Sequence, residues 1–214
     1  MILVGDSHAR ALLPAFVALA QEGKISVTAQ LKATCAWTTG KMNYDDPERS
    51  RTCEQWKAQL GPWLVSQAKT TDLIVTTGYL KTISGDAERR VDDMAAAWRP
   101  LTKLGVPIVG IADNPYHTYL PYKCLAKLDV VQADSCAVSQ KKAFPFPDPF
   151  KATAKVVPGA KSLDLTDFYC RDDVCPSVIG GVDVYRDNSH MTTTFTKTLS
   201  PYIWRGLQRL DVLN

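Results

Sequence analysis

The sequence predicts a three-layer α/β/α domain, in which helices cover both faces of a parallel sheet. Short apolar runs rich in β-branched residues alternate with segments of helical period, which is typical of this fold class. The hydrophobic content of 45% and the charged content of 22% are those of an ordinary globular protein. The length of 214 residues suits one well-buried domain. We therefore expect a single domain over residues 1–214.

Six short segments are predicted to form strands. They are residues 2–4, 25–30, 73–76, 108–111 and 182–185, with a weaker candidate at 155–157. The predicted helices cover 9–21, 53–68, 86–103 and 193–210. Pro14 lacks an amide hydrogen, so the first helix is expected to start late or to bend close to this residue.

The segment 112–152 has little periodicity and many prolines. It carries Pro115, Pro121, Pro145, Pro147 and Pro149 together with two of the cysteines. We interpret it as a long loop excursion, because connections of this length in a compact domain are usually functional or tied down.

The six cysteines, an even number, lie in segments that resemble loops. Disulfides are favoured over reduced core thiols, which would lie in strands or helices, and over a zinc site, which would need Cys-x-x-Cys spacing. The sequential pairing 35 with 53, 124 with 136 and 170 with 175 would close three short loops. It is one of fifteen possible pairings. If it holds, the domain works in an oxidising compartment.

The charge pattern points to no particular partner. A net charge of +3 is spread along the chain without a basic run, so nucleic-acid binding is not expected. No stretch approaches the roughly 20 apolar residues that span a bilayer. The opening residues also lack the basic start of a signal peptide. An exported chain needs such a peptide. We therefore expect the natural protein to extend further upstream.

Ser7 is the candidate nucleophile. It follows the predicted strand 2–4 and precedes a helix, where open α/β sheets bind ligands and helix amides can face an oxyanion. The alternative is a helix cap, which is a common role for serine at this position. A serine nucleophile also needs a base and a group that orients the base.

His190 is the candidate base and Asp187 the candidate orienting carboxylate. The chain has three histidines, and His8 is a weaker candidate because side chains of neighbouring residues generally point apart. His117 lies in the excursion beside Tyr116, as a plain loop histidine or as part of an acceptor groove. His190 follows Asp187 by three residues, so one turn can bring the carboxylate to the imidazole.

These two motifs resemble those of the SGNH, or GDSL-like, hydrolase superfamily. The matching residues are Gly5-Asp6-Ser7-His8 near the start and Asp187 with His190 near the end. The resemblance covers essentially the whole chain. It implies a flavodoxin-like three-layer fold with Ser7, Asp187 and His190 as the catalytic triad.

Two further stretches resemble SGNH domains at the carboxyl end of integral-membrane acyltransferases that O-acetylate extracytoplasmic glycans, particularly actinobacterial ones. They are Asp113-Asn114-Pro115 followed by Cys124, and Cys170 to Cys175-Pro176 followed by Gly180 and Tyr185-Arg186-Asp187. The resemblance implies a membrane portion that delivers acetyl groups from cytoplasmic acetyl-CoA. It also implies an acceptor that is a cell-envelope polysaccharide or glycolipid, and a place on the extracytoplasmic face of the membrane.

The resemblance further implies an oxyanion hole made of the Ser7 amide, Gly78 and Asn114. Gly78 follows the predicted strand 73–76, and Asn114 follows the strand 108–111. The usual Gly-x-Asn-Asp order is absent, so the segment around Asn114 can alternatively be a simple turn. This chemistry needs no metal and no bound organic cofactor.

Two other functions compete with acyl transfer to a glycan. A secreted carbohydrate or lipid esterase would pass the same acyl group to water. A glycan-binding module would keep the fold without turnover. The tryptophans are interpreted as packing residues, with Trp37 as a candidate for exposure beside Cys35.

Overall fold

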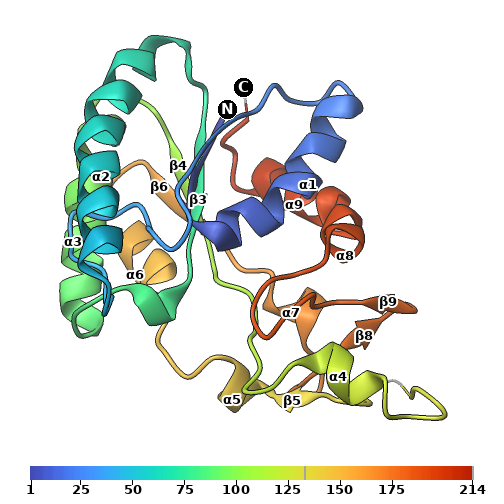
Figure 1. Ribbon diagram of the computed structural model, residues 1–214. Coiled ribbons are helices and arrows are strands. Elements are labelled where there is room, and N and C mark those ends of the chain that lie inside the picture. The colour runs from blue at the N-terminus through green and yellow to red at the C-terminus, as the bar shows by residue number, and fades with distance from the viewer. Residues whose placement is uncertain (133, 214) are drawn as a thin grey trace.

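A five-stranded parallel sheet forms the centre of the protein in the computed structural model, which describes residues 1–132 and 134–213. The strand order is β2-β1-β3-β4-β6, with every neighbouring pair parallel (Figure 1). This is the flavodoxin-like order, and it confirms the predicted α/β class. The strands are β1 (Ile2–Gly5), β2 (Thr28–Leu31), β3 (Ile74–Thr77), β4 (Ile108–Ile111) and β6 (Ala160–Leu163).

Two groups of helices cover the two faces of the sheet (Figure 1). On one face lie α1 (Ser7–Gln21), α8 (Thr193–Thr198) and α9 (Ser200–Arg209). On the other lie α2 (Pro47–Gln67), α3 (Ala87–Thr102) and α6 (Pro149–Val156). Alternate strand residues face opposite layers, so Leu3 and Val75 belong to the first core and Ile2 and Ile74 to the second.

Most of the remaining elements gather beyond the carboxyl ends of the strands (Figure 1). They are the 3-10 helix η2 (Leu80–Thr82), the helices α4 (Pro121–Leu125), α5 (Gln140–Ala143) and α7 (Thr166–Tyr169), and the strands β5 (Val138–Ser139), β7 (Val174–Cys175), β8 (Val178–Ile179) and β9 (Val182–Asp183). A second 3-10 helix, η1 (Ala68–Thr70), lies between α2 and β3. β5 pairs with β7, and β8 with β9, both antiparallel. No helix in the described part of the chain is long and apolar enough to cross a membrane.

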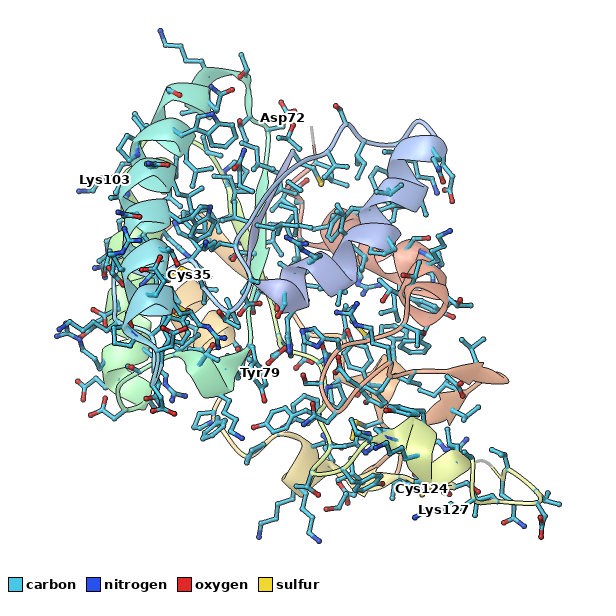
Figure 2. The ribbon with its side chains drawn as sticks, in the orientation of Figure 1. Cys35, Asp72, Tyr79, Lys103, Cys124 and Lys127 are labelled. Atoms are coloured by element: carbon cyan, nitrogen blue, oxygen red, sulfur yellow. A yellow bond between two sulfur atoms is a disulfide. The ribbon has the colours of Figure 1, made fainter. Side chains whose placement is uncertain are left out.

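All six cysteines form disulfides, in the pairing that the sequence favoured. The pairs are Cys35–Cys53, Cys124–Cys136 and Cys170–Cys175, and Cys35 and Cys124 are labelled in Figure 2. Cys53 and Cys124 lie in helices α2 and α4 and Cys175 lies in strand β7, so the prediction that the cysteines lie in loops was wrong for these three.

The weak strand predicted at 155–157 is wrong. Residues 149–156 form helix α6, which Asp148 caps by accepting a hydrogen bond from the Phe150 amide. The fifth strand of the sheet is β6 instead, at 160–163. Lys161 and Ser162 interrupt its apolar pattern, because β6 lies at an edge of the sheet.

The predicted strand 182–185 does not join the parallel sheet. Only residues 182–183 are extended as β9, and they pair with β8 in a separate hairpin. Gly180 and Gly181 form the turn with φ of 59° and 76°, which is the left-handed conformation that two-residue hairpin turns favour. The segment that carries Asp187 and His190 therefore follows a hairpin rather than a sheet strand.

Several helix boundaries also differ from the predictions. The first helix begins at Ser7, and it continues through Pro14. The second begins at residue 47, with Asp46 as its cap and Pro47 in its first turn. The predicted helix 193–210 is two helices, α8 and α9, joined at Leu199 just before Pro201. The helix predicted at 86–103 is confirmed as α3.

The segment 112–152 is not a plain loop. It contains α4, β5, α5 and the start of α6, because Pro121 and Pro149 occupy first-turn positions, where a missing amide hydrogen costs nothing. Residue 133 of this segment and residue 214 of the predicted single domain lie outside the described residues. The extent of the domain stays a prediction.

Candidate active site

The turn from β1 into α1 positions Ser7. Gly5 ends the strand with φ of 148°, and a Cβ at this position would lie 2.3 Å from the Thr77 carbonyl oxygen. Asp6 then caps the helix by accepting a hydrogen bond from the His8 amide, at 2.8 Å. Ser7 is the first residue of α1, where its amide has no acceptor within the helix. The side chain is half-buried.

Asp187 and His190 lie in one tight loop. The Asp187 Oδ1 accepts hydrogen bonds from the backbone amides of Ser189 and His190, at 2.9 and 2.7 Å. The Arg186 amide donates to the His190 carbonyl, and a bridge between Tyr185 and Met191 closes the loop. The spacing of three residues therefore forms a turn that holds the carboxylate beside the imidazole.

The structure brings Ser7, His190 and Asp187 into one hydrogen-bonded chain. The His190 Nε2 lies 2.8 Å from the Ser7 Oγ, and its Nδ1 lies 2.8 Å from the Asp187 Oδ2. The Asp187 Oδ1 is a second partner of the same nitrogen, at 3.1 Å. This geometry lets the imidazole accept the serine proton on one side while the carboxylate fixes its tautomer on the other.

Local electrostatics favour neutral His190 and ionised Asp187. Burial, followed by the positive charge of His8, lowers the pKa of His190 and outweighs the opposing effect of Asp187. Burial alone would raise the pKa of Asp187, but the hydrogen bonds donated by the His190 and Ser189 amides hold it below its ordinary value. A neutral imidazole beside a carboxylate is the state that a general base requires.

Asn114 is not placed as an oxyanion donor. Its side-chain amide donates to the backbone carbonyls of Pro115, at 2.9 Å, and Ser189, at 2.7 Å, so both amide hydrogens are used within the protein. The sequence-based role of Asn114 in the oxyanion hole therefore has no support in this geometry. Asn114 instead connects the segment after β4 to the loop that carries His190, through its hydrogen bond to the Ser189 carbonyl.

Gly78 lies directly after β3, as predicted, and packs against the turn that carries Ser7. A Cβ at Gly78 would lie 3.1 Å from the Ala36 Cβ and 3.3 Å from the Asp6 Oδ2. The next residue, Tyr79, donates its amide hydrogen to the same Asp6 oxygen, at 2.8 Å. The oxyanion roles of Gly78 and of the Ser7 amide stay predictions.

Sequence reasoning missed a second histidine–carboxylate pair. The His8 Nδ1 lies 2.6 Å from the Asp113 Oδ1, and the two side chains are 1% and 2% exposed. The His8 ring centroid is 4.9 Å from that of His190. The signal was the position of Asp113 just after β4, because the carboxyl ends of parallel strands meet at one edge of the sheet.

His117 is a buried core residue rather than part of a groove. It is 2% exposed, and its ring packs against Tyr119 and Tyr185. Burial lowers its pKa to about 4. Its ring nitrogens have no hydrogen-bond partner in the described part of the chain. Trp37, a candidate for exposure, is also buried.

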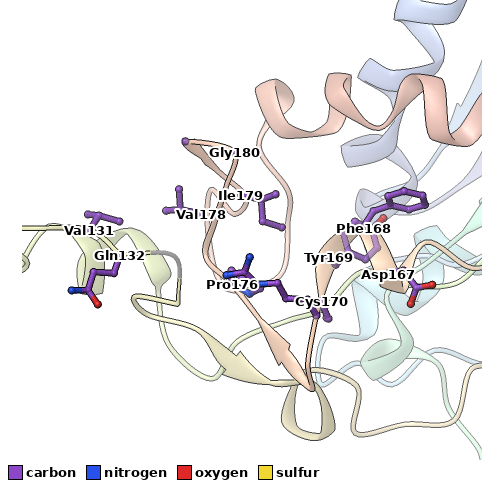
Figure 3. Close-up of a pocket in the computed structure, with 12 residues that line it drawn as sticks. Val131, Gln132, Asp167, Phe168, Tyr169, Cys170, Pro176, Val178, Ile179 and Gly180 are labelled. Atoms are coloured by element: carbon purple, nitrogen blue, oxygen red, sulfur yellow. The ribbon is translucent and has the colours of Figure 1, made fainter.

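A cavity lies between α7 and the β8–β9 hairpin. Its volume is about 370 Å³, and Figure 3 shows Phe168, Pro176 and Ile179 among the residues that line it. Ser7, Asp187 and His190 do not line it. Within residues 1–132 and 134–213, no cluster of three or more His, Cys, Asp or Glu side chains could hold a metal ion.

An open parallel sheet with a hydrogen-bonded Ser, His and Asp at the β1/β3 switch point defines a class of α/β proteins with a serine-esterase-like site. The family model described as "SGNH domain (fused to AT3 domains)" matches residues 1–205. The chain therefore belongs to this family of SGNH domains.

Two solved structures share the fold. The periplasmic domain of a lipopolysaccharide acetyltransferase from Salmonella ser. Paratyphi A aligns with a TM-score of 0.69 and 12% identity, over 99% of this chain and 83% of that one. The acetyl xylan esterase AlAXEase aligns with a TM-score of 0.56 and 12% identity, over 96% of this chain and 98% of that one. No curated protein sequence matches this chain.

Proposed function

We propose that the domain transfers an acetyl group through an acyl-Ser7 intermediate to a hydroxyl of an extracytoplasmic cell-envelope glycan or glycolipid. The observation that carries the proposal is the continuous hydrogen-bonded chain from the Ser7 Oγ through His190 to Asp187. The family description mentions fusion to AT3 domains, and one structural neighbour is described as a lipopolysaccharide acetyltransferase periplasmic domain. Both support an acyl-transfer role.

The first half-reaction forms the acyl-enzyme. His190 Nε2 takes the Ser7 proton while the Ser7 Oγ attacks the acyl carbonyl of the donor. The resulting tetrahedral intermediate collapses, the bond to the donor's leaving group breaks, and His190 returns the proton to that group. Asp187 keeps its charge throughout and stabilises the imidazolium.

The second half-reaction uses the same groups in reverse. His190 removes the proton of the acceptor hydroxyl, whose oxygen attacks the acyl carbonyl on Ser7 and displaces the Ser7 Oγ, which regains its proton. The proposal takes acetyl-CoA as the ultimate donor, with a membrane acyltransferase portion that carries the acetyl group across the bilayer. The three disulfides support a place in an oxidising extracytoplasmic compartment.

Hydrolysis is the second candidate function. Water competes with a sugar hydroxyl for the same acyl-enzyme, and a structural neighbour that aligns over 98% of its own length is described as an acetyl xylan esterase. The two functions differ only in the nucleophile of the second step. The yield of acetylated sugar relative to free acetate therefore distinguishes them.

Intact mass after treatment with a small fluorophosphonate tests the proposal. The wild-type domain is expected to gain one adduct, which Ser7→Ala and His190→Ala abolish. The matched control is Ser66→Ala, because Ser66 is an exposed serine on α2 and its loss should leave the adduct unchanged. Absence of an adduct on the wild-type domain would instead favour a glycan-binding module.

A further inference from the structure

Asp113 holds His8 in a fixed, buried position beside the candidate base. The Asp113 carboxylate accepts hydrogen bonds from the His8 Nδ1, at 2.6 Å, and from the backbone amides of Asn114 and Leu80, at 2.9 and 3.3 Å. Three donors converge on its two oxygens, which is the pattern of an ionised, acceptor-only carboxylate. A buried anion of this kind needs a cation beside it.

The surroundings of the His8 ring suit an imidazolium. The ring stacks on Tyr79, with centroids 4.5 Å apart and planes at 21°, so an aromatic face covers one side (Figure 2 labels Tyr79 near the start of α1). The other contact is with His190, whose ring meets that of His8 edge to face at 60°. The His8 Nε2 is buried and has no partner among the described residues, which opposes a proton there, so the charge on His8 depends on the Asp113 carboxylate at Nδ1 and on the Tyr79 face.

We infer that His8 and Asp113 form a buried positioning pair, in which a positively charged His8 beside His190 keeps His190 neutral and ready to accept the Ser7 proton. The inference rests on the proposed function, because it assigns a role in activating Ser7. His8 acts through His190 and is not itself a catalytic residue. It replaces no triad member, and Asp187 still orients the base.

The charged groups around the two rings are few. The charged groups near His190 are His8, which lies on α1, and Asp187 and Arg186, which lie in the same loop as His190. His8 faces Asp113 from the end of β4, Asp6 from its own turn and Asp187 from the opposite loop. Burial opposes a charge on His8, but the charge and hydrogen bond of Asp113 hold its pKa above the ordinary value.

The sign of the effect on His190 follows from distance. His8 is in ring contact with His190, whereas Asp113 bonds the Nδ1 of His8. Because the nearer charge dominates in a buried site, the pair lowers the proton affinity of His190. Loss of the His8 charge should therefore raise the pKa of His190. A protonated His190 cannot accept the Ser7 proton, so labelling of Ser7 should fail at a higher pH than in the wild type.

Nitrogen NMR of the wild-type domain, with labelled histidine, is the first part of the test. At pH 7 we expect both ring nitrogens of His8 to carry protons, whereas His190 carries one proton, on Nδ1. A neutral His8 at pH 7 would overturn the inference. This measurement needs no turnover, so it decides the point even if the domain fails to react with a fluorophosphonate and the proposed function is wrong.

The second part compares variants by the pH dependence of fluorophosphonate labelling. His8→Asn places an uncharged amide near Asp113, and we expect the acid limb of the rate profile to move up by about one pH unit. This shift corresponds to a roughly tenfold lower labelling rate at pH values below both acid limbs, and to a much smaller change in rate at alkaline pH. Asp113→Asn should move the limb in the same direction by less, because His8 then becomes neutral.

Arg10→Gln is the matched control, because it removes a positive charge from the exposed side of the same helix. Its acid limb should stay where the wild-type limb lies, since solvent screens this charge. A merely structural role for His8 would lower the His8→Asn rate by the same factor at every pH. That result, or an unmoved acid limb in both His8→Asn and Asp113→Asn, would overturn the inference.

Discussion

The backbone amide of His117 donates a hydrogen bond to the carbonyl of Asn188, at 2.7 Å. This contact ties the segment 112–152 to the loop between Asp187 and His190. Asn114 makes a second tie to the same loop through the Ser189 carbonyl. The position of the candidate base therefore depends on the excursion as well as on the sheet.

Asn114→Ala should destabilise the domain by about 1–3 kcal/mol, because it leaves the buried carbonyls of Pro115 and Ser189 without a donor. The labelling rate of Ser7 should fall along with the melting temperature, since the loop of His190 loses its anchor. Thermal denaturation and labelling kinetics of the same samples check this. Asn43→Ala is the control, because Asn43 is exposed.

A loss of two to three orders of magnitude in rate with an unchanged melting temperature would contradict this interpretation of Asn114. That is the behaviour of an oxyanion donor.

His117 should make the domain less stable in acid. Burial lowers its pKa to about 4 from 6.5, so below pH 6.5 the unfolded chain binds a proton that the folded chain does not bind until about pH 4. The stability from neutral His117 is complete above pH 6.5 and falls as the pH drops toward 4, by at most about 3 kcal/mol.

His117→Phe keeps a ring between Tyr119 and Tyr185 but cannot titrate. Urea unfolding at pH 7.5 and pH 4.5 should show a smaller acid loss in the variant than in the wild type. Equal losses in the two proteins would show that His117 does not contribute.

Gly5→Ala should cost roughly 3 kcal/mol or more, because the new methyl group meets the Thr77 carbonyl at 2.3 Å and the Ala9 Cβ at 2.8 Å. The φ of 148° adds strain for any residue with a Cβ. Gly61→Ala in α2 is the matched control, since nothing lies within 4 Å of its Cβ position. It should stabilise by about 0.5–1 kcal/mol. Urea unfolding of both variants gives the comparison, and equal effects would refute the steric argument.

The disulfides should differ in their contribution according to the loop that each closes. Cys35–Cys53 spans 18 residues, whereas Cys170–Cys175 spans 5. The chain-entropy estimate gives about 3 kcal/mol for the longer loop and about 2 kcal/mol for the shorter one. Paired Cys→Ser variants, unfolded in urea, should rank in this order, and the reverse order would rule out loop entropy as the main cause.

The sequence was most informative for the central strands, which are fully buried. Residues 74–77 and 108–111 are buried along their whole length, and each strand begins with two β-branched apolar residues, Ile-Val. The edge strand at 160–163 has no such run because Lys161 is exposed. Helix α6 was missed for a different reason: it starts with Pro149, and the many prolines of this segment were interpreted as marks of a loop.

The pairing of Asp187 with His190 could be predicted from their spacing, because the two residues interact within one turn. The His8–Asp113 pair could not, since its partners are 105 residues apart and only the strand order brings them together. The rule that neighbouring side chains point apart also misled the interpretation of His8. At the start of a helix, Ser7 and His8 can both contact one His190 ring.

The hydrogen bond between Ser7 and His190 joins residues 183 positions apart. The ribosome therefore makes the candidate nucleophile, Ser7, long before the candidate base, His190. A chain that stops before Asp187 carries Ser7 without its candidate base, His190. Labelling of Ser7 should thus require synthesis and folding of the chain through His190. A fragment that ends before His190 should form no fluorophosphonate adduct.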